Sequence, residues 1–364
     1  MSIPNHPQFP EIALNFPAQF VRGENVALQL LDYCHRFGQR IMVTGGRQAL
    51  EALYMHIGEI DASYHWFGGE CSESNIEQLV QIAQSEEIQV LVAVGGGKAI
   101  DTGKAVAEAC GLPVITIPTI LATSSAVTPL SVRYFDNGHF LDIYHLSKGP
   151  DLVLVDTALL AKSPLRWLSA GLGDTLARWY EYRAIQLPRA HINGLDAVTA
   201  FNSKLCYELI ELYGSKACQA LETQTANEAL KQVADAILLY AGMAALMSRG
   251  EHASAAHGMF DGFIVNEDMR YFGHGLLVGY GNLVLLALEG RSDDELIGAI
   301  KLARTCRIPT SLQQIKADWQ ETELLAVLST AANSSDMRQF PSSVTADMLA
   351  CACKRVDALS GQLN

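Results

Sequence analysis

The sequence lacks the features that mark several classes of protein. Its 26 lysines and arginines are outnumbered by 39 aspartates and glutamates, which gives a formal net charge of -13, and no basic cluster offers a nucleic-acid surface. No unbroken apolar run reaches the roughly 18 residues of a membrane span, and residues 1–10 lack the basic-then-apolar order of a signal peptide. We therefore expect a cytoplasmic protein that binds neither nucleic acid nor membrane.

Paired cysteine motifs are missing as well. The eight cysteines are scattered through apolar or helical context with no Cys-x-x-Cys pair, so reduced structural thiols are expected. Cys351 and Cys353 lie two residues apart and leave open a soft metal or redox site. Internal repeats and low-complexity tracts are also absent, so we expect no repeat array.

Strand and helix patterns alternate in the first part of the chain. The length of 364 residues suggests two domains, and an apolar share of 49% with 18% charged residues is typical of a globular protein. Short apolar runs between helical stretches predict a parallel sheet covered on both faces. The clearest helix is predicted over Ile76–Ser85, opened by the capping-box spacing of Ser74 and Glu77. The predicted strands are Arg40–Thr44, Tyr64–Phe67, Gln89–Val94, Val114–Ile117 and Leu152–Val155.

Beyond Ser163 and Pro164 the pattern becomes helical. Segments rich in alanine, leucine and glutamate, with few β-branched runs, predict a mostly helical second half. We therefore predict a Rossmann-like α/β nucleotide-binding domain over residues 1–161 and an all-α domain over residues 162–364, with the chemistry in the cleft between them. The clearest of these segments are Asn202–Tyr213, Ala226–Met247 and Leu276–Leu288.

Three consecutive glycines, Gly95, Gly96 and Gly97, separate a valine-rich strand from a helix. Glycines let a phosphate approach the backbone, and the free N–H groups at the start of a helix near Lys98 favour an anion. The spacing is not the dinucleotide fingerprint G-x-G-x-x-G, so the turn alone does not name its ligand. An ordinary strand-to-helix turn stays the alternative.

Three residues in the helical half have the chemistry of metal ligands. They are Asp174, His257 and His274. One carboxylate and two imidazoles with an open fourth position form a catalytic zinc set, because the vacant position accepts water or a substrate oxygen. Each histidine taken singly is more typical of a structural role.

Five motifs in a fixed order resemble the iron-containing alcohol dehydrogenase family, specifically its glycerol dehydrogenase-like branch. The resemblance implies an N-terminal nucleotide-binding domain and a C-terminal helical domain, an architecture shared with dehydroquinate synthase. It makes Asp174, His257 and His274 the ligands of a metal in the cleft, and it implies a homo-oligomer. The motifs are GGGKAIDTGKAVA, IPTILATSSAVTPLSV, PDLVLVDTALLAKSP, GLGDTLARWYE and the two histidines, across roughly residues 35–310.

The resemblance also implies which residues bind a nicotinamide coenzyme. Gly96, Gly97 and Lys98 would hold the pyrophosphate, while four further residues would line the coenzyme path. Asp101 and Lys104, three apart on the same predicted helix, are equally well explained as a simple ion pair. The four lining residues are Thr119, Thr128, Leu130 and Tyr134.

The residues that follow the predicted strand Arg40–Thr44 indicate which coenzyme is bound. Gly46 stands where glycerol dehydrogenases carry an acid that holds the ribose 2′-OH, and Arg47 follows it. A small residue with an arginine admits a 2′-phosphate, so we expect NADP(H) to be accepted and preferred over NAD(H). The alternative is that Arg47 is only a surface cation in a turn.

Several positions depart from the family pattern. Arg178 stands four residues after Asp174, on the same helical face, where iron-type relatives carry a further histidine. Zinc is therefore expected in place of iron, with another divalent metal as the alternative. Phe260 replaces a histidine three residues after His257, and Asp261 replaces an asparagine, so the site should be less polar than a polyol site.

The substrate loop departs from the polyol pattern too. Ser124 replaces an aspartate that faces the polyol in glycerol dehydrogenases. These differences resemble the hydroxycarboxylate dehydrogenases of the branch, which implies reduction of small 2-oxo acids to 2-hydroxy acids. Arg178 would then bind the substrate carboxylate beside the metal. The alternative is a solvated arginine paired with Glu181.

Three other functions remain open on the sequence. An NAD-dependent glycerol or polyol dehydrogenase keeps the metal and the glycine turn. A dehydroquinate synthase-like lyase shares the architecture, the nucleotide and zinc, but it is expected to carry glutamate in place of Asp174. A non-catalytic nucleotide sensor would keep the fold without turnover.

Overall fold

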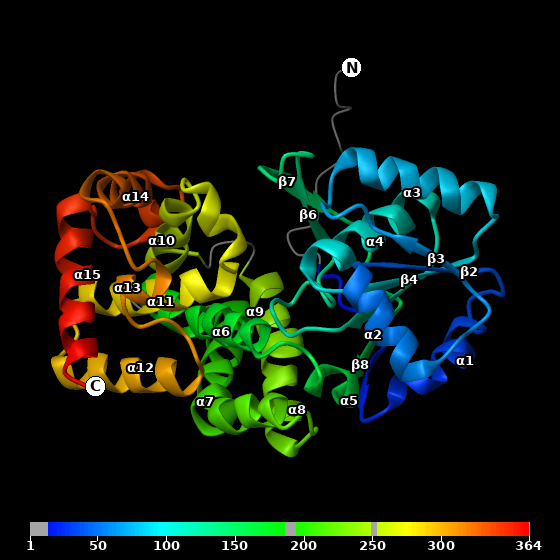
Figure 1. Cartoon of the computed structure of the whole chain (residues 1–364), viewed down its shortest axis with the longest axis horizontal. Helices are drawn as coiled ribbons and strands as arrows, with labels where there is room; N and C mark the ends of the chain where they lie inside the picture. Colours follow the sequence, from blue (N-terminus) through cyan, green and yellow to red (C-terminus); the bar gives the residue numbers. More distant parts are fainter. Residues whose placement is uncertain (1–13, 186–193, 249–252, 364) are drawn as a thin grey trace.

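Six parallel strands form the centre of the N-terminal half (Figure 1). The computed structural model describes residues 14–185, 194–248 and 253–363, so residues 1–10, on which the signal-peptide expectation rests, lie outside the described residues. The strand order is β1-β8-β5-β4-β2-β3, and every pairing is parallel. The strands are β1 (Phe20–Gly23), β2 (Ile41–Gly45), β3 (Ser63–Trp66), β4 (Val90–Gly95), β5 (Val114–Pro118) and β8 (Leu152–Asp156).

Both faces of this sheet are buried under helices. In β4, Val90, Val92 and Val94 pack into one core with η1, α1, α2 and α5, whereas Leu91 and Ala93 pack into the other with α3 and α4. Side chains alternate along a strand, so a sheet covered on both faces needs an unbroken apolar run. The helices are η1 (Val26–Gln29), α1 (Leu30–Cys34), α2 (Arg47–Ile57), α3 (Glu73–Ser85), α4 (Gly97–Cys110) and α5 (Thr157–Ala161).

All five predicted strands are present, and the prediction of a parallel sheet covered on both faces is confirmed. Three strands were not predicted: β1, a four-residue edge strand, and the antiparallel hairpin of β6 (Leu130–Tyr134) and β7 (Phe140–His145). The predicted start of α3 was wrong. Ser72, not Ser74, caps this helix by accepting a hydrogen bond from the backbone N–H of Asn75, while Ser74 donates to Asp136.

The second half of the chain is helical, as predicted. Among the described residues no strand follows β8. The predicted helix Ala226–Met247 is interrupted, because a π-helical segment, η2, separates α8 from α9. The helices are α6 (Leu165–Ile185), α7 (Gly194–Glu222), α8 (Glu228–Ala234), η2 (Asp235–Tyr240), α9 (Ala241–Met247), α10 (Ala255–Phe263), η3 (Glu267–Tyr271), α11 (His274–Leu288), α12 (Asp293–Thr305), α13 (Leu312–Ile315), α14 (Glu321–Asn333), η4 (Met337–Gln339) and α15 (Ala346–Gly361).

One described helical run, Glu228–Met247, is long and apolar enough to cross a membrane by length and composition. Of its most apolar window, 61% is buried inside the protein, as in the core helices of soluble proteins, so this run is weak evidence for a membrane span. Its buried residues pack in the core of the helical half.

The glycine turn lies where the strand order reverses. The chain runs outward from β2 to β3 and then returns to the other side of β2 as β4, which makes the ends of β2 and β4 a topological switch point. Gly95 adopts a φ of 139°, a conformation that side chains disfavour, and a Cβ on it would lie 3.8 Å from the backbone nitrogen of Gly46. The two predicted coenzyme segments therefore lie side by side at the ends of β2 and β4.

Helices α6 and α11 cross with their backbones in contact. A Cβ on Gly173 would overlap the carbonyl oxygen of Gly275, and a Cβ on Gly275 would overlap the carbonyl oxygen of Ala170. Only glycine permits this approach, which brings Asp174 of α6 beside the start of α11.

Replacing Gly275 with alanine should therefore destabilise the protein by about 1–3 kcal/mol, because the methyl group overpacks the crossing. Gly298→Ala on α12 is the matched control, since a Cβ there meets nothing within 4 Å, and alanine should be neutral or stabilising by about 0.5–1 kcal/mol. Urea unfolding of both variants measures the difference. Equal effects on the free energy of unfolding would contradict the close crossing.

Candidate active site

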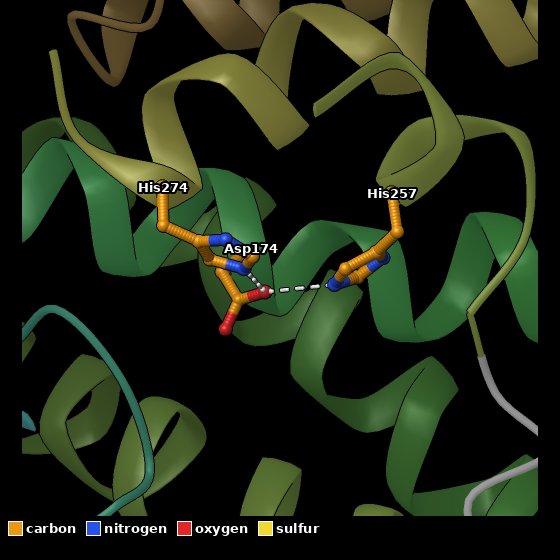
Figure 2. A group of neighbouring side chains, drawn as sticks. All are labelled: Asp174, His257 and His274. Carbon is orange, nitrogen blue, oxygen red and sulfur yellow. Dashed lines mark ion pairs between the residues drawn. The ribbon is translucent and has the colours of Figure 1, made fainter. Parts of the chain in front are cut away.

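The three predicted metal ligands meet at one point, each from a different helix (Figure 2). Asp174 lies on α6, His257 on α10, and His274 is the first residue of α11. The Oδ1 of Asp174 lies 3.5 Å from Nε2 of His257 and 3.4 Å from Nε2 of His274. One ligand atom from each residue lies within 4.8 Å of the others, which is a spacing that a single metal ion can bridge.

The carboxylate at the centre of this group is buried and incompletely paired. Asp174 is 6% exposed, and its Oδ1 has no hydrogen-bond partner, because both imidazole nitrogens are too distant for well-formed bonds. Burial opposes ionisation of Asp174, but the Arg178 guanidinium and the two histidines hold its pKa well below the usual range. A buried, ionised oxygen without a hydrogen-bond partner is costly. A cation between this oxygen and the two imidazole nitrogens would remove that cost.

Glu181 holds His257 in place from the side opposite Asp174. Its Oε2 lies 2.7 Å from Nδ1 of His257, and its Oε1 accepts hydrogen bonds from the backbone N–H groups of Ser254 and His257. Burial lowers the pKa of His257, but Glu181 and Asp174 outweigh it and raise that pKa to about 10. The Nδ1 contact leaves Nε2 directed at Asp174, which is the carboxylate–histidine arrangement typical of metal ligands. Sequence reasoning considered Glu181 only as a partner for Arg178.

Arg178 is buried beside the same carboxylate. Its side chain is 10% exposed, and Nη2 lies 3.7 Å from Oδ2 of Asp174. Its Nε and Nη1 have no hydrogen-bond partner in the described part of the chain. The alternative of a solvated arginine paired with Glu181 is wrong, because Arg178 is buried and Glu181 is occupied by His257 and Ser254.

Phe260 gives the site an apolar wall. Its ring packs edge-on against His274, with centroids 4.3 Å apart. The next residue, Asp261, has its pKa raised to about 6 by burial and by the neighbouring carboxylate of Asp336. Phe260 and Asp261, which both depart from the family pattern, therefore lie near the metal-ligand group. Phe260 contacts His274, and His257 and His274 both act to lower the pKa of Asp261.

The glycine turn opens α4 as predicted, with Gly96 at the N-cap position. A Cβ on Gly97 would lie 3.4 Å from Oγ1 of Thr123 and 3.8 Å from Oγ of Ser125, so these hydroxyls also face the turn. Sequence reasoning missed both, although the hydroxyl-rich run around Ser124 was a signal for them. Lys98 forms an ion pair with Glu70 at 2.5 Å.

Tyr134, a second predicted coenzyme residue, also contacts Lys98. The Nζ of Lys98 lies 4.7 Å from the centre of the Tyr134 ring. The carboxylate of Glu70 and the ring together hold the ammonium close to the glycine turn.

Gly46 and Arg47 lie at the end of β2 and the start of α2. Gly46 occupies the N-cap position, and a Cβ there would meet only Phe67, at 3.7 Å. The Arg47 guanidinium stacks on the ring of Trp66 at 4.4 Å. This stacking gives the Arg47 side chain a defined position at the start of α2.

The remaining predicted residues lie on segment 119–130 between the two halves, which is irregular up to Pro129 and ends on Leu130, the first residue of β6. A Cβ on Gly171 of α6 would overlap the carbonyl oxygen of Leu121, and one on Gly242 of α9 would lie 3.5 Å from Cβ of Ser124. Ser124 is therefore at the junction of sheet and helices. Of the predicted coenzyme residues, this segment carries Thr119, Thr128 and Leu130.

Other residues singled out from the sequence have structural explanations. Asp101 and Lys104 form an ion pair at 2.9 Å, which confirms that interpretation. All eight cysteines are free thiols, as expected. Cys351 is exposed and Cys353 is buried, and among the described residues the only potential metal-binding group is the one at Asp174.

Comparisons with known proteins identify relatives of this chain. The family described as iron-containing alcohol dehydrogenase matches residues 17–157. Glycerol dehydrogenase of Thermotoga maritima is 33% identical, covering 94% of this chain and 96% of its own length. Hydroxycarboxylate dehydrogenase A of Escherichia coli is 34% identical over 86% of this chain and 88% of its own. A crystal structure of a probable glycerol dehydrogenase from Sinorhizobium meliloti has a TM-score of 0.83 at 30% identity, covering 96% of this chain and 99% of that chain.

Substituting Glu181 with glutamine should weaken the binding of a divalent cation about 10- to 100-fold, because the amide no longer fixes and polarises the His257 ring. Zn²⁺ titration against a competing chelator measures this affinity. Glu211→Gln on α7 is the control, since that carboxylate contacts Tyr207 and no residue of the site. An unchanged affinity in Glu181→Gln would contradict the positioning role.

Proposed function

Because the chain belongs to the iron-containing alcohol dehydrogenase family, in its glycerol dehydrogenase-like branch, we propose that it reduces small 2-oxo acids to 2-hydroxy acids. At the coarser level, it is an oxidoreductase that acts on CH–OH groups with a nicotinamide coenzyme and a divalent metal. A lyase or a non-catalytic sensor does not fit relatives that are named as dehydrogenases and reductases.

Asp174, His257 and His274 hold the metal in this proposal, and zinc is the metal that the donor set suits best. The fit rests on the unpartnered Oδ1 of Asp174 and on the Nε2 atoms of the two histidines. A divalent cation there acts as a Lewis acid that polarises the carbonyl oxygen of the substrate. Glu181 keeps His257 oriented, and the half-exposed His274 leaves one side of the group open.

The coenzyme binds at the ends of β2 and β4, the strand switch point, in this proposal. The glycines at Gly95 to Gly97 leave room for the pyrophosphate at the start of α4, with Lys98 as a nearby cation. The hydroxyls of residues 119–130 would bind and orient the coenzyme, which would supply the hydride for the reduction. The residues of this segment proposed to line the path are Thr119, Thr128 and Leu130, followed by Tyr134 on the same strand as Leu130.

The observation that carries the 2-oxo acid proposal is the incompletely paired guanidinium of Arg178, whose Nη2 lies near Asp174 while Nε and Nη1 have no acceptor in the described part of the chain. Buried N–H groups without acceptors are costly, and a substrate carboxylate would accept a hydrogen bond from one of these nitrogens, in a fork that shares Nη2.

A polyol is the second candidate substrate, favoured by the glycerol dehydrogenases among the relatives. Ser124 in the substrate segment and Phe260 beside His274 argue against it, because neither carries the charge expected of a polyol site. We also propose that the protein forms a homo-oligomer and acts in the cytoplasm. Measurement of the molecular mass in solution tests the oligomer.

Replacing Arg178 with leucine should raise KM for 2-oxo acids and lower kcat/KM about 10- to 100-fold, corresponding to the loss of a charge-assisted contact of about 1.5–3 kcal/mol. Activity with neutral aldehydes should change far less. A coupled assay at 340 nm with 2-oxo acids, aldehydes and polyols, with and without chelator, measures both. Equal changes for charged and neutral substrates would overturn the anchor, and glycerol oxidation by NAD as the dominant wild-type activity would favour the polyol candidate.

NADPH should be used by the wild-type protein with a higher kcat/KM than NADH, because Gly46 leaves space and Arg47 supplies a cation. Gly46→Asp should reverse this preference, since a carboxylate there repels a 2′-phosphate and accepts hydrogen bonds from the ribose. Steady-state kinetics with both coenzymes decide the question. A tenfold wild-type preference for NADH would reject the prediction.

A further inference from the structure

Lys104 is a fully buried cation bound to backbone oxygens. Its Nζ donates hydrogen bonds to the carbonyl oxygens of Ser125, at 2.7 Å, and Thr128, at 3.0 Å, and to that of Leu130. It also forms an ion pair with Asp101 at 2.9 Å. The side chain has no exposed surface, so water cannot substitute for any of these contacts.

Two of the three carbonyls, those of Ser125 and Thr128, belong to the irregular part of segment 119–130, and the third is that of Leu130, at the start of β6. Backbone groups outside a strand or helix ladder must be satisfied in some other way. Two further contacts supplement Lys104. The hydroxyl of Thr116 on β5 donates to the carbonyl of Ala126 within the segment, and Asp101 on α4 accepts the backbone N–H of Val132, two residues beyond the segment on β6. The segment's shape therefore depends on side chains of α4 and β5.

Lys104 also couples this segment to the glycine turn. It lies two turns into α4, the helix that Gly96 and Gly97 open. The helical half also contacts the segment closely. Gly171 of α6 lies against the backbone of Leu121, and Gly242 of α9 lies against Val127, and a Cβ on either glycine would clash. One ammonium group thus joins the helix of the glycine turn to the segment that carries Ser124.

We propose that Lys104 is a positioning residue for coenzyme binding, because its ammonium holds the carbonyls of residues 125, 128 and 130 and so fixes segment 119–130 relative to the glycine turn. This inference rests on the proposed nicotinamide site. It assigns Lys104 no contact with the coenzyme or the substrate.

Two variants separate this role from simple stability. Lys104→Met removes the donors but leaves the Asp101 carboxylate buried without its cation, which is destabilising. In the double variant Asp101→Asn/Lys104→Met, no charge is left unpaired, and the asparagine oxygen still accepts the N–H of Val132. The double variant should therefore recover part of the thermal stability lost in Lys104→Met. The carbonyls of residues 125, 128 and 130 still lack the Lys104 donor, which keeps part of the loss.

Both variants should bind NADPH and NADH more weakly, with kcat/KM for the coenzyme falling roughly 10- to 100-fold. Nicotinamide fluorescence measures binding without turnover, and hydrogen–deuterium exchange should show faster exchange confined to residues 119–130. Arg304→Met is the matched control. Arg304 also binds backbone carbonyls, those of Ser360 and Leu363, but at the C-terminal helix. Its loss should leave coenzyme affinity within about twofold of wild type.

Coenzyme affinity that recovers together with thermal stability in the double variant would overturn the proposal, since the effect would then be stability alone. Unchanged exchange in residues 119–130, or an equal loss of affinity in Arg304→Met, would overturn it as well. A wild-type protein without dehydrogenase turnover would instead refute the proposed function, and the binding and exchange measurements report on Lys104 independently of turnover.

Discussion

The close crossing of α6 and α11 is the constraint on which the candidate site depends. Glycines at the crossing let the two backbones touch, and this contact sets the distance between Asp174 and His274. Helix α6 also carries Arg178 and Glu181, which lie four and seven residues after Asp174 and therefore share its face. A buried helix with a polar stripe must find partners for that stripe, and those partners are His257 and His274.

The two halves of the chain supply different physical means of binding. The sheet contributes backbone N–H groups and space, since Gly46 and the glycines at Gly95 to Gly97 converge at the strand switch point. The helices contribute ionised side chains held in a low-dielectric interior, where an unpaired charge is costly. Segment 119–130 lies between them and is tied to the sheet by Lys104 and fitted against α6 and α9. Substrate and coenzyme would therefore meet where that segment lies.

Local patterns predicted the sheet well, because strands buried on both faces leave unbroken valine and isoleucine runs. They failed where the signal is short or distant. β1 has only four residues at the sheet edge, and the true cap of α3 is Ser72, because Ser74 is taken up by Asp136. The π-helical segment η2 inside Ala226–Met247 has no local signature in the sequence. The edge position of β1, the contact of Ser74 with Asp136 and the distortion at η2 all result from tertiary packing.

The alternation of strands and helices, the glycine turn, the spacing of Asp174 from Arg178 and the metal-binding residue types could be predicted, because those properties depend on neighbours along the chain. Three contacts could not. Folding brings Glu181 to His257, buries Arg178 with two nitrogens that lack acceptors among the described residues, and places Lys104 on three carbonyls more than twenty residues away. Each of these contacts joins distant segments, and their geometry follows from helix crossings that no local pattern encodes.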